Sequence, residues 1–399
     1  MPCSTGYIPL NLQATAKPSM STYFHGKEGL LPEDFLQALP DMDLDRIAFG
    51  FHYFPETGFA DFFACDQQDL IRLHSPAELH NCLGYSGFVA FPFQPGAIGY
   101  LIPPLLDLSD CMSERFVVRG FFREEEEENA PWLNEIQPLS GDDYKARVAD
   151  AIGAIEGGFF EKVVMSRTDR RPFSKEQLQP FLTEVFRKYA GANLMVFNIP
   201  GKGFWVSASP EVLLAYGYSI LGAPQASIVS HAMAGTRPAD SELPWDEKEL
   251  MEQAVVARFI EERFSELVPA ELIQKWGPGE QIAGNIKHLS SIFHVRGGTA
   301  QLAVMLLNKL HPTPAVCGFP FDSAFGWLIE NEKLDRSFFS GFSGSFHPER
   351  MKFVVNLRTA CFRDENLLFF AGAGIMKDSD PSSELEETES KIDTLRMLI

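Results

Sequence analysis

Two stretches of the chain carry glutamates at a helical spacing, and one of them also carries a lysine. Glu384, Glu387 and Lys391 stand at i, i+3 and i+7, which places all three on one helical face. Glu249 and Glu252 form a second pair at i and i+3. A single stripe of this kind is usually a solvated helix face. Two such helices that face each other could instead hold a divalent ion, and oxygen-only ligation favours Mg²⁺ over Zn²⁺.

A glycine-rich strand end precedes the C-terminal acidic helix. Residues 371–374 read Ala-Gly-Ala-Gly and are followed by a polar loop with a proline. The glycines leave backbone N–H groups open to an anionic ligand. Gly372 and Gly374 do not form a dinucleotide fingerprint, because the third glycine and the ribose-binding acid are missing. The chain also lacks P-loop, nucleophile-elbow and zincin motifs, so none of those enzyme classes is indicated.

Three further charged residues stand among apolar neighbours. Desolvation of Lys162 would lower the pKa of its ammonium towards that of a usable base. On spacing alone, however, a lysine that extends to the surface is favoured. Burial of Glu211 would raise its pKa, so that it could hold the proton of a general acid. Arg358 is expected inside a strand over residues 353–360, where it would need a carboxylate partner.

The elements that position these residues are strands in the first part of the chain and a mixture afterwards. Aromatic-rich runs up to about residue 120 favour strands. Five consecutive glutamates at 124–128 predict an exposed linker. Beyond it we expect a helix capped by Asp142 and Asp143, a β-hairpin over 193–209, a glycine turn at 234–238, and helices over 246–268 and 299–310.

The composition is that of an acidic globular chain. Its 399 residues, 45% of them hydrophobic, could form one large domain or two or three smaller ones. No apolar run is long enough to span a membrane, and the start lacks a signal-peptide pattern. Six scattered cysteines predict buried thiols in a reducing cytoplasm. The net charge of −20 argues against nucleic acid as a partner, but a local cationic pocket could still bind a small anion.

A series of short motifs between about residues 140 and 398 resembles the chorismate-utilising enzymes. This family includes isochorismate synthase, salicylate synthase, anthranilate synthase component I and aminodeoxychorismate synthase. The motifs, in the order in which the family has them, are KVVMSR, SASPEVLL, AGTRP, EKELMEQ, KHLSS, HPTPAVCG, DRSFFSGFSG, NLRTA, FAGAGI and ELEETESK.

The resemblance implies an α/β (α+β) fold with a single large chorismate-binding domain, like that of anthranilate synthase component I. Two packed, mostly antiparallel sheets would carry helices on the outside, with the active site between the sheets. Residues 1–140 would supply strands that complete the fold and end in the acidic linker. Residues 141–399 would form the catalytic region.

The resemblance also assigns a metal site. Glu252 and Glu387 would bind Mg²⁺, and Glu249 and Glu384 would lie beside them or act through water. The ring carboxylate of chorismate would bridge to the ion.

Substrate-binding residues follow from the same motifs. Lys391 and the backbone of Gly235 would lie near the ring carboxylate, whereas the enolpyruvyl carboxylate would meet Arg358 and the N–H of Gly372. The remaining residues of the implied site are Thr236, Ala315 and Phe339, with His288 among the catalytic groups.

The residue at position 162 separates the branches of the family. Members that add ammonia have glutamine there, and members that add water have lysine, as this chain does. The resemblance therefore implies that Lys162 deprotonates a water that attacks ring C2, while Glu211 protonates the departing C4 hydroxyl. The product would be isochorismate.

Two alternatives stay open at this point. Salicylate synthases also have the lysine, but they tend to have threonine in place of Ala315. Together with Phe339, where aminating members tend to have tyrosine, this alanine favours stopping at isochorismate. The other alternative, an inert chorismate-binding protein, would predict loss of a key residue. Gln253 and Leu250 depart from the family's usual histidine and arginine, which leaves the tuning of the metal site open.

The expected partners are few. We predict a cytoplasmic protein that binds chorismate, with no nucleic acid, membrane or amidotransferase subunit as partner, and a monomer by default. Menaquinone and siderophore pathways both begin with this reaction, so the sequence does not distinguish them.

Overall fold

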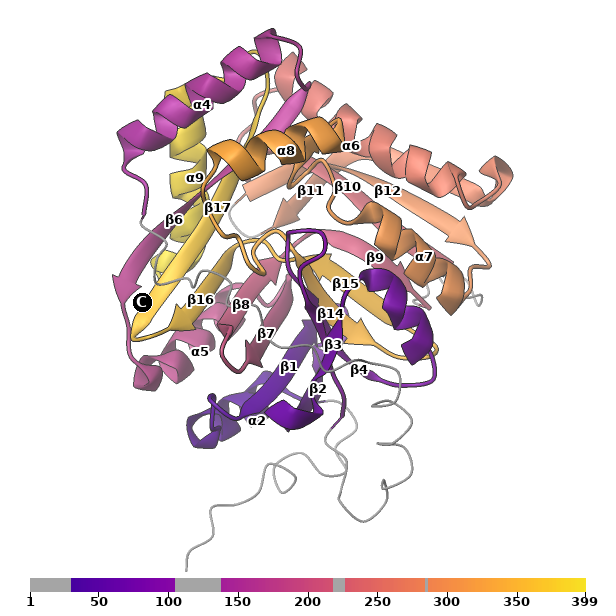
Figure 1. Cartoon of the computed structure of the whole chain (residues 1–399), viewed down its shortest axis with the longest axis vertical. Coiled ribbons are helices and arrows are strands. Elements are labelled where there is room, and N and C mark those ends of the chain that lie inside the picture. The colour runs from indigo at the N-terminus through magenta and orange to yellow at the C-terminus, as the bar shows by residue number, and fades with distance from the viewer. Residues whose placement is uncertain (1–29, 105–137, 218–226, 284–285) are drawn as a thin grey trace, which may run out of the picture.

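The chain folds into two packed antiparallel sheets with helices outside, as predicted (Figure 1). The computed structural model describes residues 30–104, 138–217, 227–283 and 286–399, so the glutamate run at 124–128 lies outside the described residues. The first sheet has the strand order β13-β6-β17-β16-β8-β7-β1-β2, and the second β11-β12-β10-β9-β15-β14-β4-β5-β3.

The bounds of the strands and helices are as follows. The first sheet contains β1 (Ile47–Phe54), β2 (Phe59–Asp66), β6 (Lys162–Pro172), β7 (Asn193–Ile199), β8 (Gly203–Ser209), β13 (Gly318–Phe319), β16 (Thr359–Arg363) and β17 (Asn366–Ile375). The second contains β3 (Ile71–Leu73), β4 (Gly87–Phe91), β5 (Gly99–Ile102), β9 (Val212–Tyr216), β10 (Ser227–Pro238), β11 (Ile273–Ala283), β12 (Ile286–Arg296), β14 (Phe342–Phe346) and β15 (Met351–Val355). The helices are α2 (Pro32–Ala38), α4 (Gly141–Glu156), α5 (Leu178–Lys188), α6 (Glu247–Ser265), α7 (Ala300–Leu310), α8 (Phe321–Asn331) and α9 (Pro381–Arg396).

The N-terminal strands belong to both sheets. β1 pairs with β7 of the first sheet, and β4 pairs with β14 of the second. Phe88 of β4 meets Phe197 of β7 at a ring distance of 5.6 Å. Together with the buried Trp205, these rings form part of an aromatic core between the sheets. Because aromatic side chains bury large apolar areas, this core fixes how the two sheets face each other.

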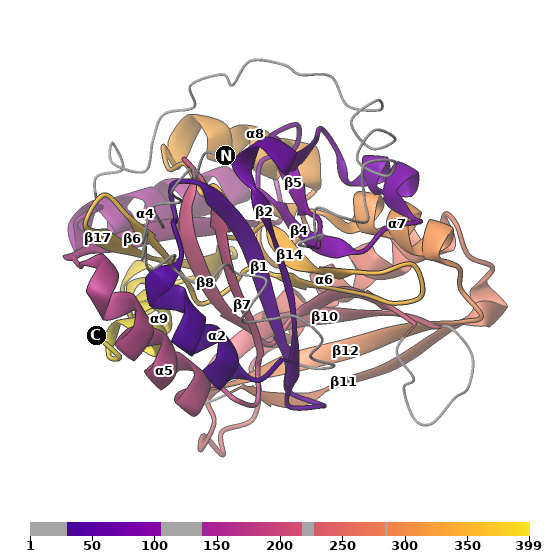
Figure 2. The same cartoon turned by 90° about the horizontal axis from the view of Figure 1, so that it is seen from below.

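The helices cover the outer faces of the sheets. α6 and α7 contact strands of the second sheet, and α9 contacts β17 of the first. Figure 2 shows α2, α5 and α9 on one face of the first sheet and the second sheet against its other face. Among the described residues, none of the helices combines the length and apolar character that crossing a membrane would need.

The helix predicted from residue 246 begins there, but the predicted cap of α4 was wrong. Asp246 caps α6, and Asp380 caps α9 by accepting a hydrogen bond from the N–H of Ser383 at 2.9 Å. α4 is capped by Ser140 instead of the predicted aspartates, because the Ser140 hydroxyl oxygen accepts from the N–H of Asp143. The aspartates lie in the first turn, where their charge favours the helix N-terminus.

Two predictions about the strands were wrong, and one was confirmed. The expected glycine turn at 234–238 is an irregularity within β10, where Gly235 has a φ of 70° and the strand then continues. Arg358 lies outside any strand, between β15 and β16, with a φ of 46°. The hairpin of β7 and β8 pairs Asn193 with Ser209, as expected.

The cysteines that the structure describes are buried free thiols, in agreement with the sequence. They are Cys65, Cys82, Cys317 and Cys361, while Cys3 and Cys111 lie outside the described residues.

Candidate active site

A pocket lies where strands of the two sheets meet α6 and α9, with about 710 Å³ of empty space that includes its opening to solvent. It collects most of the predicted site residues from widely separated parts of the chain. Lys162, Glu249 and Glu384 are not part of its lining. The predicted residues that do line it are Glu211, Gly235, Thr236, Glu252, His288, Ala315, Phe339, Arg358, Gly372, Glu387 and Lys391.

Lys162 lies behind the pocket wall and is fully buried, so the surface lysine favoured by spacing alone is ruled out. Strand side chains project from the faces of a sheet, and Lys162 projects towards Glu252 of α6, so this packing keeps it from solvent. Its Nζ is 3.0 Å from Oε1 of Glu252, which does line the pocket. Burial acts to raise the pKa of Glu252, but the charge of Lys162 outweighs it and lowers that pKa.

Glu211 is buried in the pocket, as predicted. The residue is 2% exposed, and its Oε1 has no hydrogen-bond partner among the described residues. Burial raises the pKa of Glu211 to about 8, although the positive charges of Lys162 and Arg358 act in the opposite direction. The carboxyl group is therefore largely protonated at neutral pH, which is the form that a general acid needs.

His288 and Arg358 form a buried pair that the sequence did not predict. The Nδ1–H of His288 donates to the carbonyl oxygen of Gly235 at 2.7 Å, which makes Nε2 the acceptor of a 2.6 Å hydrogen bond from Arg358. Thr236 Oγ1 is also 3.3 Å from Nδ1. Arg358 thus has a neutral histidine as its partner, so the prediction of a carboxylate partner was wrong.

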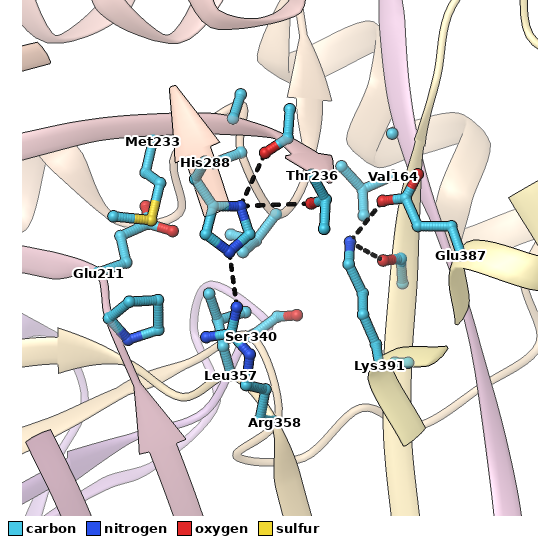
Figure 3. A pocket seen from close by; sticks show the side chains of 18 of the residues that line it. Val164, Glu211, Met233, Thr236, His288, Ser340, Leu357, Arg358, Glu387 and Lys391 are labelled. Carbon is cyan, nitrogen blue, oxygen red and sulfur yellow. Dashed lines mark hydrogen bonds and ion pairs between the residues drawn. The ribbon is translucent and has the colours of Figure 1, made fainter. Parts of the chain in front are cut away.

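The charge states of this pair follow from its surroundings. Burial, assisted by the charge of Arg358, lowers the pKa of His288 to about 3. Burial also lowers the pKa of Arg358 to about 10, so the guanidinium stays charged at neutral pH. Figure 3 shows Glu211 and the pair of Glu387 and Lys391 on opposite sides of the pocket, with His288 and Arg358 between them. The pocket thus has a fixed cation at its centre.

The carboxylates on α9 are held by lysines. Glu387 is 2.7 Å from Nζ of Lys391, which also donates to the carbonyl oxygen of Gly372 at 2.9 Å. Glu384 is paired with Lys248 of α6. Burial, together with the nearby charge of Glu387, raises the pKa of Glu384. The second oxygen of Glu384, Oε2, is buried with no hydrogen-bond partner in the described part of the chain.

Glu249 has a different environment from the other acidic residues. Both of its carboxylate oxygens are bound by the guanidinium of Arg237, and one also accepts from the N–H of Asp246. It closes the capping box of α6 and does not reach the pocket. Within the described ranges, no three acidic, histidine or cysteine side chains are arranged closely enough to hold a metal ion.

Several residues of the site were missed from the sequence. Lys248 stands four positions before Glu252, so helical spacing alone could have placed it near the acidic face. Met233, Ser340 and Leu357 line the pocket, but their types and spacing carry no sign of it.

The chain belongs to the chorismate binding enzyme family, which it matches over residues 111–399. It is similar to isochorismate synthase DhbC of Bacillus subtilis, with 30% identity over 69% of this chain and 72% of that protein. The salicylate biosynthesis isochorismate synthase of Pseudomonas aeruginosa is 30% identical over 63% of this chain, which spans 54% of that relative's length.

Solved structures support the fold. The menaquinone-specific isochorismate synthase MenF of Escherichia coli superposes with a TM-score of 0.71 at 18% identity, covering 91% of this chain and 90% of that one. Anthranilate synthase component I of Streptococcus pneumoniae superposes with a TM-score of 0.59 at 15% identity, covering 98% of this chain and all of that one.

Proposed function

We propose that this protein is an isochorismate synthase, which converts chorismate to isochorismate. The observation that carries the proposal is the pairing of two environments in one site: a fully buried Lys162 beside Glu252, and a buried Glu211 whose raised pKa keeps its proton. Relatives that match 65% and 69% of this chain are named isochorismate synthases. We further propose that the protein acts as a cytoplasmic monomer without an amidotransferase subunit.

The proposed reaction needs one base and one acid. Lys162, beside Glu252 at the pocket wall, would take a proton from water as the water oxygen bonds to ring C2. The bond from C4 to its hydroxyl breaks as the ring double bonds shift, and Glu211 would give its proton to the departing oxygen. One water is added and one is lost, so the product is an isomer of the substrate. Each proton transfer of this kind is typically worth about 10²–10⁴-fold in rate.

The cationic groups suit a dianionic substrate. Arg358 would hold one carboxylate in the centre of the pocket, and Lys391 would meet the other near Gly372. The neutral tautomer of His288 would position Arg358 without adding a second positive charge there. A strongly acidic chain can therefore bind a dianion through local charges.

We propose that Glu252 and Glu387, which line the pocket, hold Mg²⁺ with Glu384 beside them. In the described ranges these carboxylates are not close enough to hold an ion as they stand, so they would draw together around it. Their oxygen donors fit this hard cation, and the orphaned Oε2 of Glu384 is a buried acceptor without a partner among the described residues. Glu249 does not fit this role, because Arg237 binds both of its oxygens. When bound, the ion would neutralise these carboxylates and attract a substrate carboxylate to this side of the pocket.

The test is to incubate purified protein with chorismate and Mg²⁺ and to resolve the products by chromatography or proton NMR. We expect isochorismate to accumulate until a mixture with chorismate persists, and turnover to stop with a chelator and return with added Mg²⁺. Accumulation of salicylate and pyruvate would identify a lyase instead. Absence of any product would overturn the proposed function, and turnover that survives chelation would overturn the metal.

A methyl group at Gly374 is expected to disturb the site while the fold is kept. A Cβ at this position would lie 2.2 Å from Oε1 of Glu252 and 3.1 Å from Cε of Lys162. Since the carboxylate is the far end of a flexible side chain, Gly374→Ala should fold but displace Glu252. We expect about a 10²-fold loss in kcat/KM, the scale of a 1 Å misplacement.

Gly153→Ala in α4 is the matched control, because its Cβ would meet open space. It should keep full activity and gain about 0.5–1 kcal/mol in the free energy of unfolding. Wild-type kcat/KM in Gly374→Ala would show that the Lys162–Glu252 contact is not needed for turnover.

A further inference from the structure

Ser340 is a polar residue of the pocket that the proposed reaction does not use. The residue lines the pocket and is 1% exposed, and its Oγ has no hydrogen-bond partner among the described residues. Buried hydroxyl groups without a partner are unfavourable and uncommon in folded proteins. Because Ser340 lines a ligand pocket, a bound ligand is the natural source of the missing partner of its hydroxyl.

The backbone of Ser340 is held in an unfavourable conformation. Its φ of 62° lies in the left-handed region, as does the φ of 46° at Arg358, and both residues line the same pocket. The other non-glycine residues with positive φ in the described ranges do not line it: Lys333, Ser337, Asp364 and Glu365. Backbone strain of this kind persists where the surroundings hold it, often at ligand sites.

Asn356 holds Ser340 next to the segment that carries Arg358. The carbonyl oxygen of Asn356 accepts from the N–H of Ser340 at 3.0 Å, and its side-chain N–H₂ donates to the carbonyl oxygen of Phe338 at 3.0 Å. Asn356 is fully buried and stands two residues before Arg358. Figure 3 places Ser340 and Arg358 on the same side of the pocket. Ser340 and Arg358 therefore lie where one group of a ligand could meet both residues.

We propose that Ser340 is a further substrate-binding residue, whose Oγ–H donates a hydrogen bond to the substrate carboxylate that Arg358 pairs with. A carboxylate accepts several hydrogen bonds, so one group can take both donors. A hydrogen bond to an ionised acceptor is also stronger than one between neutral groups. This assignment rests on the proposed function, since it requires a carboxylate substrate in this pocket.

The test compares Ser340→Ala and Ser340→Gly with wild type, using chorismate and Mg²⁺. Both variants lose the hydroxyl, and glycine in addition suits the left-handed backbone. We expect KM to rise about 10-fold in both, with kcat within about 2-fold of wild type, since one charge-assisted hydrogen bond is worth about a factor of ten. The midpoint of denaturant unfolding should not fall in either variant.

Ser290→Ala is the matched control, because Ser290 is also a buried serine without a hydrogen-bond partner among the described residues but does not line the pocket. Its KM should equal that of wild type. A wild-type KM in Ser340→Ala would overturn the proposal. A wild-type KM in Ser340→Gly alone would overturn it as well, because the backbone conformation at this position, and not the hydroxyl, would then determine binding.

Calorimetric titration with chorismate separates this inference from the proposed function. If the wild type binds chorismate without turning it over, the proposed reaction fails, yet about 10-fold weaker binding by Ser340→Ala would still support the hydrogen bond. If the wild type neither binds nor converts chorismate, both proposals fall.

Discussion

Replacing Lys162 by glutamine is expected to lower kcat by about 10²–10⁴-fold, the usual contribution of a general base. Glutamine is close to lysine in length and keeps an N–H donor for Glu252, but it cannot accept a proton from water. Nζ of Lys162 lies 3.0 Å from Oε1 of Glu252 in a fully buried position, so the substitution should preserve the packing. Steady-state kinetics with chorismate, together with an unfolding curve, check the result.

Two variants separate the roles of charge and base. Lys162→Arg keeps a positive charge beside Glu252 but cannot lose its proton, so it should be as inactive as Lys162→Gln. Lys309→Gln removes the lysine of an exposed pair with Glu266 and should change neither rate nor stability by a measurable amount. If Lys162→Gln folds and still adds water at the wild-type rate, Lys162 is not the base.

The burial of Lys162 is a feature that the sequence around it could not predict. A lysine at the start of an apolar strand reaches water if the face of the sheet on which its side chain lies is open to solvent. Lys162 instead meets Glu252 of α6, and β6 pairs with β13 and β17, all of which come from residues far along the chain. The sequence around residue 162 contains no information on these neighbours, so spacing alone favoured the wrong environment.

Local patterns predicted some local features correctly and others, such as the glycine turn at 234–238, wrongly. The spacing of Glu384, Glu387 and Lys391 predicted a helix, and α9 carries all three. Helical spacing could not show which cation each carboxylate meets. Glu384 pairs with a lysine 136 positions earlier in the chain, and Arg358 meets a histidine 70 positions away. Such partners are set by tertiary packing. The family resemblance did not supply these two pairs, although all four residues stand in its motifs.

Replacing Glu211 by glutamine is expected to lower kcat by about 10²–10⁴-fold as well, because an amide cannot supply the proton that the departing hydroxyl needs. The wild-type rate should also depend on the protonation of Glu211. Since burial raises the pKa of Glu211 to about 8, the fraction of enzyme with a protonated carboxyl decreases as the pH rises through that value. We therefore expect kcat/KM to fall above about pH 8.

The same pKa shift predicts a stability effect that does not depend on activity. The folded-state pKa of about 8 lies above the ordinary value of 4.5, so the protonated form of Glu211 contributes stability that is fully present below about pH 4.5. That contribution is lost as the pH rises to about 8, at about 1.4 kcal/mol per pH unit. Glu211→Gln has no proton to lose. Its free energy of unfolding minus that of wild type should therefore increase from about pH 4.5 to about pH 8 and stay constant at higher pH.

Denaturant unfolding of both proteins at pH 5, 6.5, 8 and 9 measures this difference. Glu184→Gln in α5 is the control, because Glu184 is an exposed carboxylate paired with Arg187, whose hydrogen bond lowers the pKa of Glu184. Its difference from wild type should be constant over the same range, since Glu184 is ionised throughout. A constant difference for Glu211→Gln would mean that Glu211 ionises normally in the folded protein. The carboxyl would then carry no proton at neutral pH, and the departing hydroxyl would need another acid.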